Sequence, residues 1–186
     1  MKLKLLVLVL ALQTAWLLGM VVMQEHALVN GIIILLETKP VDPRDMLSGD
    51  YLMLNYKISD VPVSLFLPPI GKELPYGTKV FVAVAPGTNG FYMVTHASTN
   101  EMGVSANEVL LLGKSSLWWR NFGGFHSNDT IHVEYGLERY YIAEGTGNPA
   151  GKLTVKAIVP ASGRAKIKEV MVNGKPYSEI MKPDGD

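Results

Sequence analysis

The sequence predicts an all-β domain, mainly antiparallel and arranged as a sandwich or a partly open barrel, that follows one N-terminal transmembrane helix. Two observations predict this class. Residues 5–24 contain no charged side chain, and the remaining chain alternates short β-branched and aromatic runs with turns rich in glycine and proline. Short strands separated by such turns are typical of sandwiches and barrels, and no sustained helical period follows residue 24.

The opening apolar segment is long enough to cross a bilayer, because about 20 residues at about 1.5 Å each span a hydrocarbon core of about 30 Å. Lys2 and Lys4 precede this segment, whereas Glu25 and His26 follow it. The positive-inside rule therefore predicts a cytoplasmic N-terminus and a domain outside, in the periplasm or at the cell surface. We expect the lipid bilayer to hold residues 5–24.

A cleaved signal peptide is the competing interpretation. Signal peptides usually have an apolar core of about 7–15 residues that ends at a small-x-small cleavage site. Here the apolar run is longer, and Val22-Met23-Gln24 is a poor cleavage site. The sequence therefore favours an uncleaved signal anchor and a single-pass membrane protein.

The expected division is a cytoplasmic stub and anchor at 1–24, an extracytoplasmic β-rich domain at 25–181 and a disordered tail at 182–186. A domain of about 160 residues can build a hydrophobic core without disulfides. The apolar run at residues 31–36 is too short to span a membrane and is expected to be a buried strand. In order, the expected strands are residues 31–37, 50–58, 63–67, 79–85, 90–97, 107–112, 129–135, 138–143, 153–159 and 164–172.

Composition excludes several kinds of site. The chain has 17 basic and 17 acidic residues, which implies no basic face and no nucleic-acid partner. It has no cysteine, which rules out disulfides, iron–sulfur clusters and a thiol nucleophile. The four histidines show neither HxH nor HExxH spacing, so we predict no metal and no cofactor.

The most distinctive stretch is GDYLMLNY at residues 49–56, which VDPRD precedes at residues 41–45. A second stretch, YGLERYYIAEGTG, covers residues 135–147, and a weaker one combines GRA at 163–165 with NGK at 173–175. In these segments and in their order, the chain resembles the bacterial GDYXXLXY protein family. The resemblance covers most of the expected domain.

The resemblance implies where the protein is located, but it implies no chemical reaction. Similar proteins are membrane-anchored, have no established function and are often found with multi-pass membrane proteins, which implies a polytopic membrane protein as a partner. One departure is visible: the segment between Gly147 and Lys152 is short here, where similar proteins tend to have a longer, helix-prone insertion.

The first motif is expected to be a tight turn that enters a strand. Gly49 frees the backbone, and the Asp50 side chain can accept hydrogen bonds from turn amides. The strand that follows should alternate its side chains between two faces. These predicted faces are Tyr51, Met53 and Asn55 on one side, and Leu52, Leu54 and Tyr56 on the other.

The second motif contains a charged run. Alternation puts Glu138 and Tyr140 on one face of its strand, and Arg139 and Tyr141 on the other. A buried arginine needs a carboxylate partner, and such an ion pair would join the two motifs. A polar cleft and a solvated surface are the alternatives. The acidic residues that could pair with Arg139 are Asp42, Asp50 and Glu144.

Two candidate sites result from these motifs and from residues 117–125. The first is a polar cluster with either a structural or a binding role. The second is an aromatic segment that forms a core strand, a loop at the membrane interface or a hydrophobic partner site. The polar cluster consists of Asp42, Arg44, Asp45, Asp50, Tyr51, Tyr56, Glu138, Arg139, Tyr140 and Glu144; the aromatic patch consists of Trp118, Trp119, Phe122 and Phe125.

For function, the sequence favours a non-enzymatic binding or accessory module for a membrane or envelope partner. The alternative is a hydrolase. A Gly-Asp turn and an apolar strand just after an anchor also resemble signal peptidases, but the position of their nucleophilic serine is Val41 here, and no general-base lysine is evident. Carboxylates near Asp50 and Glu138 are the other acid–base candidates. We therefore assign no catalytic residue from sequence.

Overall fold

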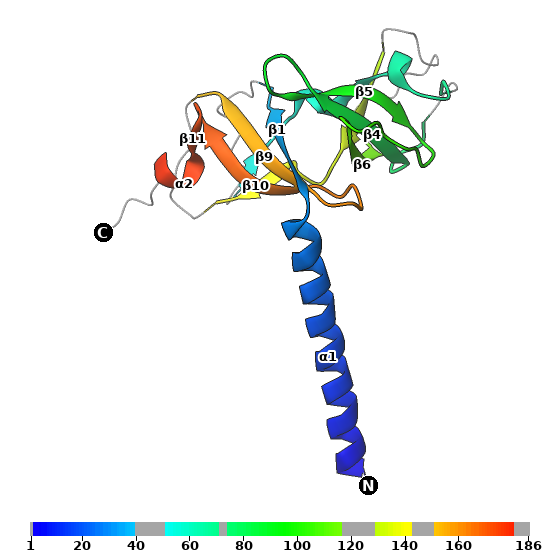
Figure 1. The fold of residues 1–186 in the computed structure, drawn as a ribbon, viewed down its shortest axis with the longest axis vertical. Helices are drawn as coiled ribbons and strands as arrows, with labels where there is room; N and C mark the ends of the chain where they lie inside the picture. Colours follow the sequence, from blue (N-terminus) through cyan, green and yellow to red (C-terminus); the bar gives the residue numbers. More distant parts are fainter. Residues whose placement is uncertain (1, 40–50, 71–73, 117–128, 143–150, 181–186) are drawn as a thin grey trace. The chain divides into compact units, whose positions relative to one another are not determined.

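The computed structural model describes residues 2–39, 51–70, 74–116, 129–142 and 151–180. The chain divides into two compact units, Met1–Gly31 and Ile32–Asp186. Figure 1 shows both units.

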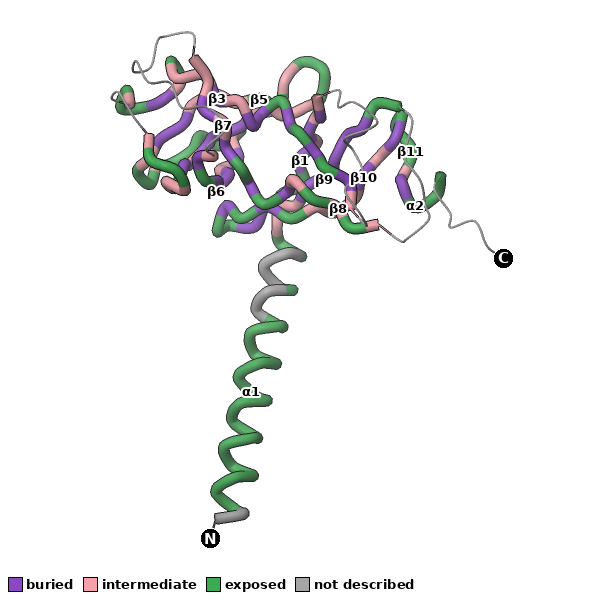
Figure 2. The backbone as a smooth tube through the Cα atoms, turned by 180° about the vertical axis from the view of Figure 1, so that it is seen from behind, coloured by how far each residue is buried: buried purple, intermediate pink, exposed green. Residues whose placement is uncertain are grey.

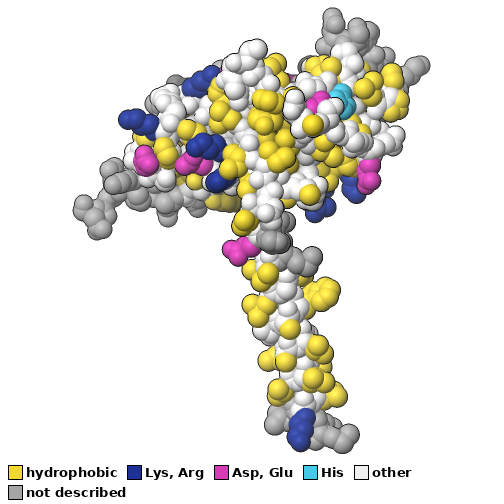
Figure 3. Space-filling model, in the orientation of Figure 1, with side chains coloured by type: hydrophobic (Ala, Val, Ile, Leu, Met, Phe, Trp, Pro, Cys, Tyr) yellow, Lys and Arg dark blue, Asp and Glu magenta, His cyan; other side chains and the backbone are white. Residues whose placement is uncertain are grey.

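The first unit contains α1 (Lys2–Val29). Its segment Lys4–Val22 is exposed throughout and is long and apolar enough to cross a membrane. Figure 3 shows apolar side chains along α1 between a basic end and an acidic end. The predicted N-terminal apolar helix is confirmed, and its length and composition fit a membrane anchor and a signal sequence alike.

The second unit contains a five-stranded antiparallel sheet that forms a nearly closed barrel, in the order β3–β7–β6–β4–β5 (Figures 1 and 2). A short 3-10 helix, η2 (Val63–Leu65), follows β3, and a bridge between Phe66 and Ala97 then brings this segment beside β5. That bridge joins the two edges of the sheet and nearly closes the barrel. The strands are β3 (Asp60–Pro62), β4 (Lys79–Pro86), β5 (Tyr92–Ser98), β6 (Val109–Ser115) and β7 (Thr130–Glu134).

A four-stranded antiparallel sheet packs beside the barrel, in the order β1–β9–β10–β11. The Leu112 N–H of β6 donates a 2.8 Å hydrogen bond to the Gly163 carbonyl in the β9–β10 turn, which ties this sheet to the barrel. A separate two-stranded ribbon pairs β2 with β8. The bounds are β1 (Ile32–Glu37), β9 (Leu153–Val159), β10 (Lys166–Val172), β11 (Lys175–Pro176), β2 (Tyr51–Met53), β8 (Arg139–Tyr141) and α2 (Tyr177–Ile180).

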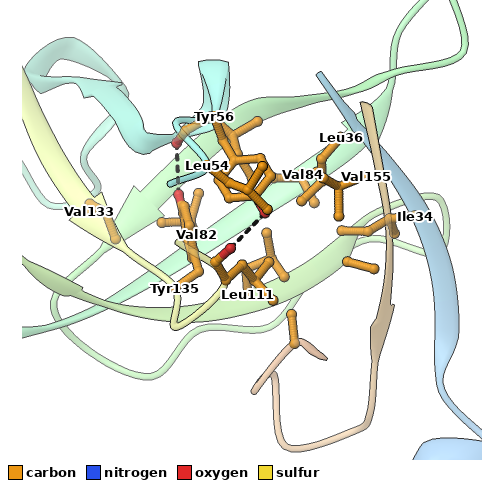
Figure 4. Packing of buried hydrophobic residues seen from close by; sticks show 14 of the residues in the cluster. Ile34, Leu36, Leu54, Tyr56, Val82, Val84, Leu111, Val133, Tyr135 and Val155 are labelled. Atoms are coloured by element: carbon orange, nitrogen blue, oxygen red, sulfur yellow. Dashed lines mark hydrogen bonds between the residues drawn. The ribbon is translucent and has the colours of Figure 1, made fainter. Parts of the chain in front are cut away.

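One hydrophobic core serves both sheets and the ribbon (Figure 4). Strand alternation explains its composition: Val155 and Ala157 of β9 point inward, and so do Val80 and Val82 of β4. Figure 2 shows the resulting alternation of buried and exposed positions along the strands. The predicted β-rich fold is therefore confirmed.

Two of the expected strands differ from the structure. Residues 63–65 form η2 and Phe66 makes only an isolated bridge to Ala97, so the expected strand 63–67 is absent. Pro62, Pro68 and Pro69 flank this segment and cannot donate to a ladder. The expected strand 50–58 is also interrupted. After β2 the chain no longer pairs with β8, and Tyr56 forms an isolated bridge with Thr38. A 3-10 helix, η1 (Lys57–Ser59), then precedes β3.

Candidate functional site at the β2–β8 ribbon

The ribbon brings the two sequence motifs together. β2 comes from the GDYLMLNY motif and β8 from the YGLERYY motif, and they pair antiparallel with Tyr51 opposite Tyr141 and Met53 opposite Arg139. The Leu54 N–H extends the pairing with a 2.8 Å hydrogen bond to the Glu138 carbonyl. The predicted faces of the first motif are confirmed, because the side chains of residues 52, 54 and 56 are buried and those of 51, 53 and 55 are not.

The outer side of the ribbon carries aromatic, apolar and cationic side chains, and we call Tyr51, Met53, Arg139 and Tyr141 the ribbon face. The Arg139 guanidinium lies 5.3 Å from the centre of the Tyr51 ring, which is a cation–π distance. The Tyr51 and Tyr141 rings have centroids 5.9 Å apart. Tyr141 is 72% exposed and Met53 is 47% exposed, so this face offers large apolar groups to solvent.

The inner side of the ribbon is locked by two tyrosine hydroxyls. Tyr56 is fully buried and donates a 2.7 Å hydrogen bond to the Leu137 carbonyl, while Tyr135 donates a 2.8 Å hydrogen bond to the Ile58 carbonyl (Figure 4). Burial raises the pKa of both hydroxyls, and the nearby Glu138 carboxylate raises it further. Both groups therefore stay protonated and act as donors: Tyr56 ties the first motif to the second, and Tyr135 ties the second motif to η1.

Glu138 and Tyr140 also have structural contacts. The Glu138 carboxylate accepts a 2.6 Å hydrogen bond from the Tyr135 N–H across the turn at Gly136, whose φ is +79°. The Tyr140 ring packs edge-on against Tyr177, with centroids 5.9 Å apart. Glu138 thus fixes a turn, which is a structural use of this carboxylate rather than that of an open acid–base group.

An open hollow of about 340 Å³ lies beside the ribbon. Gly136, residues 139–141 and residues 165–167 line it. Its lining combines two cations, Arg139 and Lys166, with two tyrosines and apolar side chains, and contains no acidic side chain.

The structure describes Arg139 but does not describe every residue of the two predicted sites. Arg139 is exposed, so the premise of a buried arginine that needs a carboxylate is wrong for this residue. Its described contact is the Tyr51 ring. The following predicted residues lie outside the described ranges: Asp42, Arg44, Asp45, Asp50, Glu144, Trp118, Trp119, Phe122 and Phe125.

Sequence reasoning missed an ionic cluster at the barrel. Asp60 pairs with Lys39 through one carboxylate oxygen, and its other oxygen lies 2.8 Å from His132 Nδ1. These residues are far apart in sequence, and only the β3–β7 register brings Asp60 opposite His132. The neighbouring Ser59 has a buried hydroxyl that makes no hydrogen bond to His132, so these residues do not form a Ser–His–Asp relay.

The electrostatics of this cluster stabilise the fold. Partial burial would raise the pKa of the Asp60 carboxyl, but hydrogen bonds from Lys39 and His132 outweigh burial and hold the pKa below its usual value. Because the folded-state pKa lies below the unfolded-state pKa, this stabilisation is present above the unfolded-state value. It is lost as the pH falls through the folded-state value.

A second ionic cluster joins β1, η1 and the start of β9. Glu37 accepts ion pairs from Lys152 at 2.6 Å and Lys57 at 2.8 Å. Both lysines lower the pKa of the Glu37 carboxyl. In the described part of the chain, no three His, Asp or Glu side chains converge as a group that could hold a metal ion.

Together, these observations define a class: a β-barrel domain with a motif-built ribbon, preceded by a helix that is long and apolar enough to cross a membrane. A family model described as GDYXXLXY protein matches residues 13–170, so the chain belongs to the GDYXXLXY protein family. No curated protein and no solved structure matches the chain.

Proposed function

We propose that residues 5–24 remain in the bilayer as an uncleaved anchor, with the N-terminus in the cytoplasm and the β domain, residues 25–181, outside. The domain acts as a non-enzymatic module that binds a polytopic membrane protein through the ribbon face. The apolar, fully exposed helix segment Lys4–Val22 supports the anchor, because exposed apolar surface of that length is stable in lipid rather than in water.

The observation that carries the binding role is the contrast between the two sides of the ribbon. On the inner side, the Tyr56 hydroxyl and one carboxylate oxygen of Glu138 are engaged in hydrogen bonds to backbone. On the outer side, Tyr141 and Met53 stay exposed around Arg139. Tyrosine and arginine are enriched among residues that dominate binding energy at protein interfaces, and the inner hydrogen bonds hold this face rigid.

Site-specific photocrosslinking tests this role. We expect a photoreactive phenylalanine analogue at Tyr141, in the full chain in its native membrane, to give an adduct with a multi-pass membrane protein. The same analogue at Tyr76, which is 66% exposed outside the ribbon, is the matched control and should give no such adduct. Arg139→Ala should lower the yield at position 141 by about thirty-fold, since interface hot spots contribute about 2 kcal/mol or more.

Two results would contradict the binding role. One is an equal set of adducts from positions 141 and 76, which would mean random collision. The other is a chain that is membrane-bound and folded but gives no adduct at position 141.

A further inference from the structure

We propose that the sheet edge where β1 begins, directly after the anchor in the chain, binds the anionic phosphate headgroups of the bilayer that holds the chain. This edge consists of the start of β1, the β9–β10 turn and the start of β10, and we call it the basal edge. The inference rests on the proposed anchor and adds a ligand class, anionic phospholipid, for the domain itself.

The length of the connecting chain keeps the basal edge near the membrane. From Val22 to Val29 the chain is helical, which covers about 10 Å at about 1.5 Å per residue. From Val29 to Ile32 it covers at most about 10 Å more, at about 3.5 Å per residue. Ile32 therefore lies within about 20 Å of the hydrocarbon core, whatever the angle between the helix and the domain. About 5–7 Å of that distance is headgroup layer.

The strand register places basic residues at the same edge as Ile32. β1 and β9 are antiparallel, with Ile32 opposite Val159, and β9 and β10 are antiparallel, with Lys166 opposite Ile158. The β9–β10 turn, at residues 160–165, therefore lies at the end of the sheet where β1 begins. Adjacent strands are about 4.8 Å apart, so Ile32 and Lys166 are only about 10 Å apart across the sheet.

The chemistry of the basal edge suits an anionic lipid surface. Arg164, Lys166 and Lys168 are all exposed, and no ion pair joins them to an acidic side chain among the described residues. The acidic residue of β10, Glu169, is already paired with Lys156 at 2.7 Å. Ile32 and Ile33 are 53% and 49% exposed and add apolar surface to this edge.

The hollow beside the ribbon adjoins the basal edge, because both include residues at the start of β10, and it could bind a headgroup. Residues 165–167 form one wall and Arg139 with two tyrosines forms the other. Its volume of about 340 Å³ is in the lower range of small-ligand sites, which start near 300 Å³. Arg139 and Lys166 supply donors for phosphate oxygens, and tyrosine favours the membrane–water interface.

The test uses the full chain in lipid nanodiscs with one cysteine as a reporter. Because the chain has no cysteine, Ser162→Cys provides a single labelling site in the exposed β9–β10 turn. A nitroxide on this residue reports its accessibility to a water-soluble nickel complex. We expect protection in discs of phosphatidylcholine with phosphatidylglycerol, none in phosphatidylcholine alone, and loss of protection at high salt.

Charge-matched variants locate the binding edge. Arg164→Gln with Lys166→Gln should lower the ratio of docked to undocked domains about thirty-fold, since each basic residue near an anionic surface contributes about fivefold. Lys57→Gln with Lys175→Gln removes as much charge from the region opposite the basal edge, where Lys57 of η1 pairs with Glu37 at the end of β1 and Lys175 lies in β11, and should leave the protection unchanged. A similar loss in both variants would overturn the proposal.

The same experiment distinguishes failure of the headgroup site from failure of the proposed membrane anchor. A chain that fails to elute with the nanodiscs contradicts the anchor itself. A chain that elutes with them, but whose label is equally accessible in both lipids, overturns only the headgroup site. Protection that requires an added membrane protein instead of phosphatidylglycerol would mean that the basal edge binds protein, and would also overturn it.

Discussion

Replacing Tyr56 by alanine should lower the free energy of unfolding by about 4 kcal/mol, the range expected for deleting a fully buried aromatic side chain. Tyr56 is completely buried and packs where the ribbon meets both sheets. Tyr56→Phe keeps the ring but leaves the Leu137 carbonyl without its donor in the core, and should cost about 1.5 kcal/mol. Urea unfolding of the full chain in detergent micelles, followed by near-ultraviolet circular dichroism, measures both values.

The control for this prediction is Tyr76→Ala, because Tyr76 is an exposed tyrosine. Its substitution should change the free energy of unfolding by less than about 0.5 kcal/mol. If Tyr56→Ala proved as mild as Tyr76→Ala, the first motif would not be the structural link between the sheets and the ribbon.

Gly113→Ala should destabilise the barrel by about 3 kcal/mol through overpacking. A Cβ on Gly113 would overlap Val133 Cγ1 and would lie 2.9 Å from the Glu134 carbonyl oxygen. The side chain of Val133 is buried and the carbonyl is backbone, so neither can move away without shifting β7. The same urea unfolding experiment measures this loss.

Gly103 is the matched glycine for that comparison. A Cβ there would have no atom within 4 Å, and Gly103 does not have a positive φ. Gly103→Ala should therefore be neutral within about 0.5 kcal/mol. Equal effects at positions 103 and 113 would mean that β6 and β7 are not as closely packed at Gly113 as the structure has them.

Much of the fold could be predicted from the sequence because its period-2 pattern is local. Strands such as β4 and β9 have runs of β-branched residues between turns, and the inner and outer faces of the first motif follow from alternation alone. The segment 63–67 shows the limit of this argument. Its residues favour a strand, but the flanking prolines remove the donors that a ladder requires.

The contacts at the candidate site could not be predicted to the same extent, because they depend on register. The Arg139 side chain contacts the Tyr51 ring only because Arg139 pairs with Met53 on the neighbouring strand. If the pairing of β8 with β2 shifted by one residue, the Arg139 side chain would lie on the other face of the ribbon. The cluster of Asp60 with His132 likewise depends on pairing between segments 72 residues apart, for which the sequence contains no local signal.

The intact mass of the chain recovered from membranes tests the anchor most directly. Membranes are washed with alkaline carbonate, which releases peripheral proteins, and the retained chain is weighed by mass spectrometry. Uncleaved insertion predicts that the retained chain still includes the whole apolar helix, residues 4–22. A mature chain that begins near residue 25 and is found in the carbonate wash would contradict a membrane-tethered module.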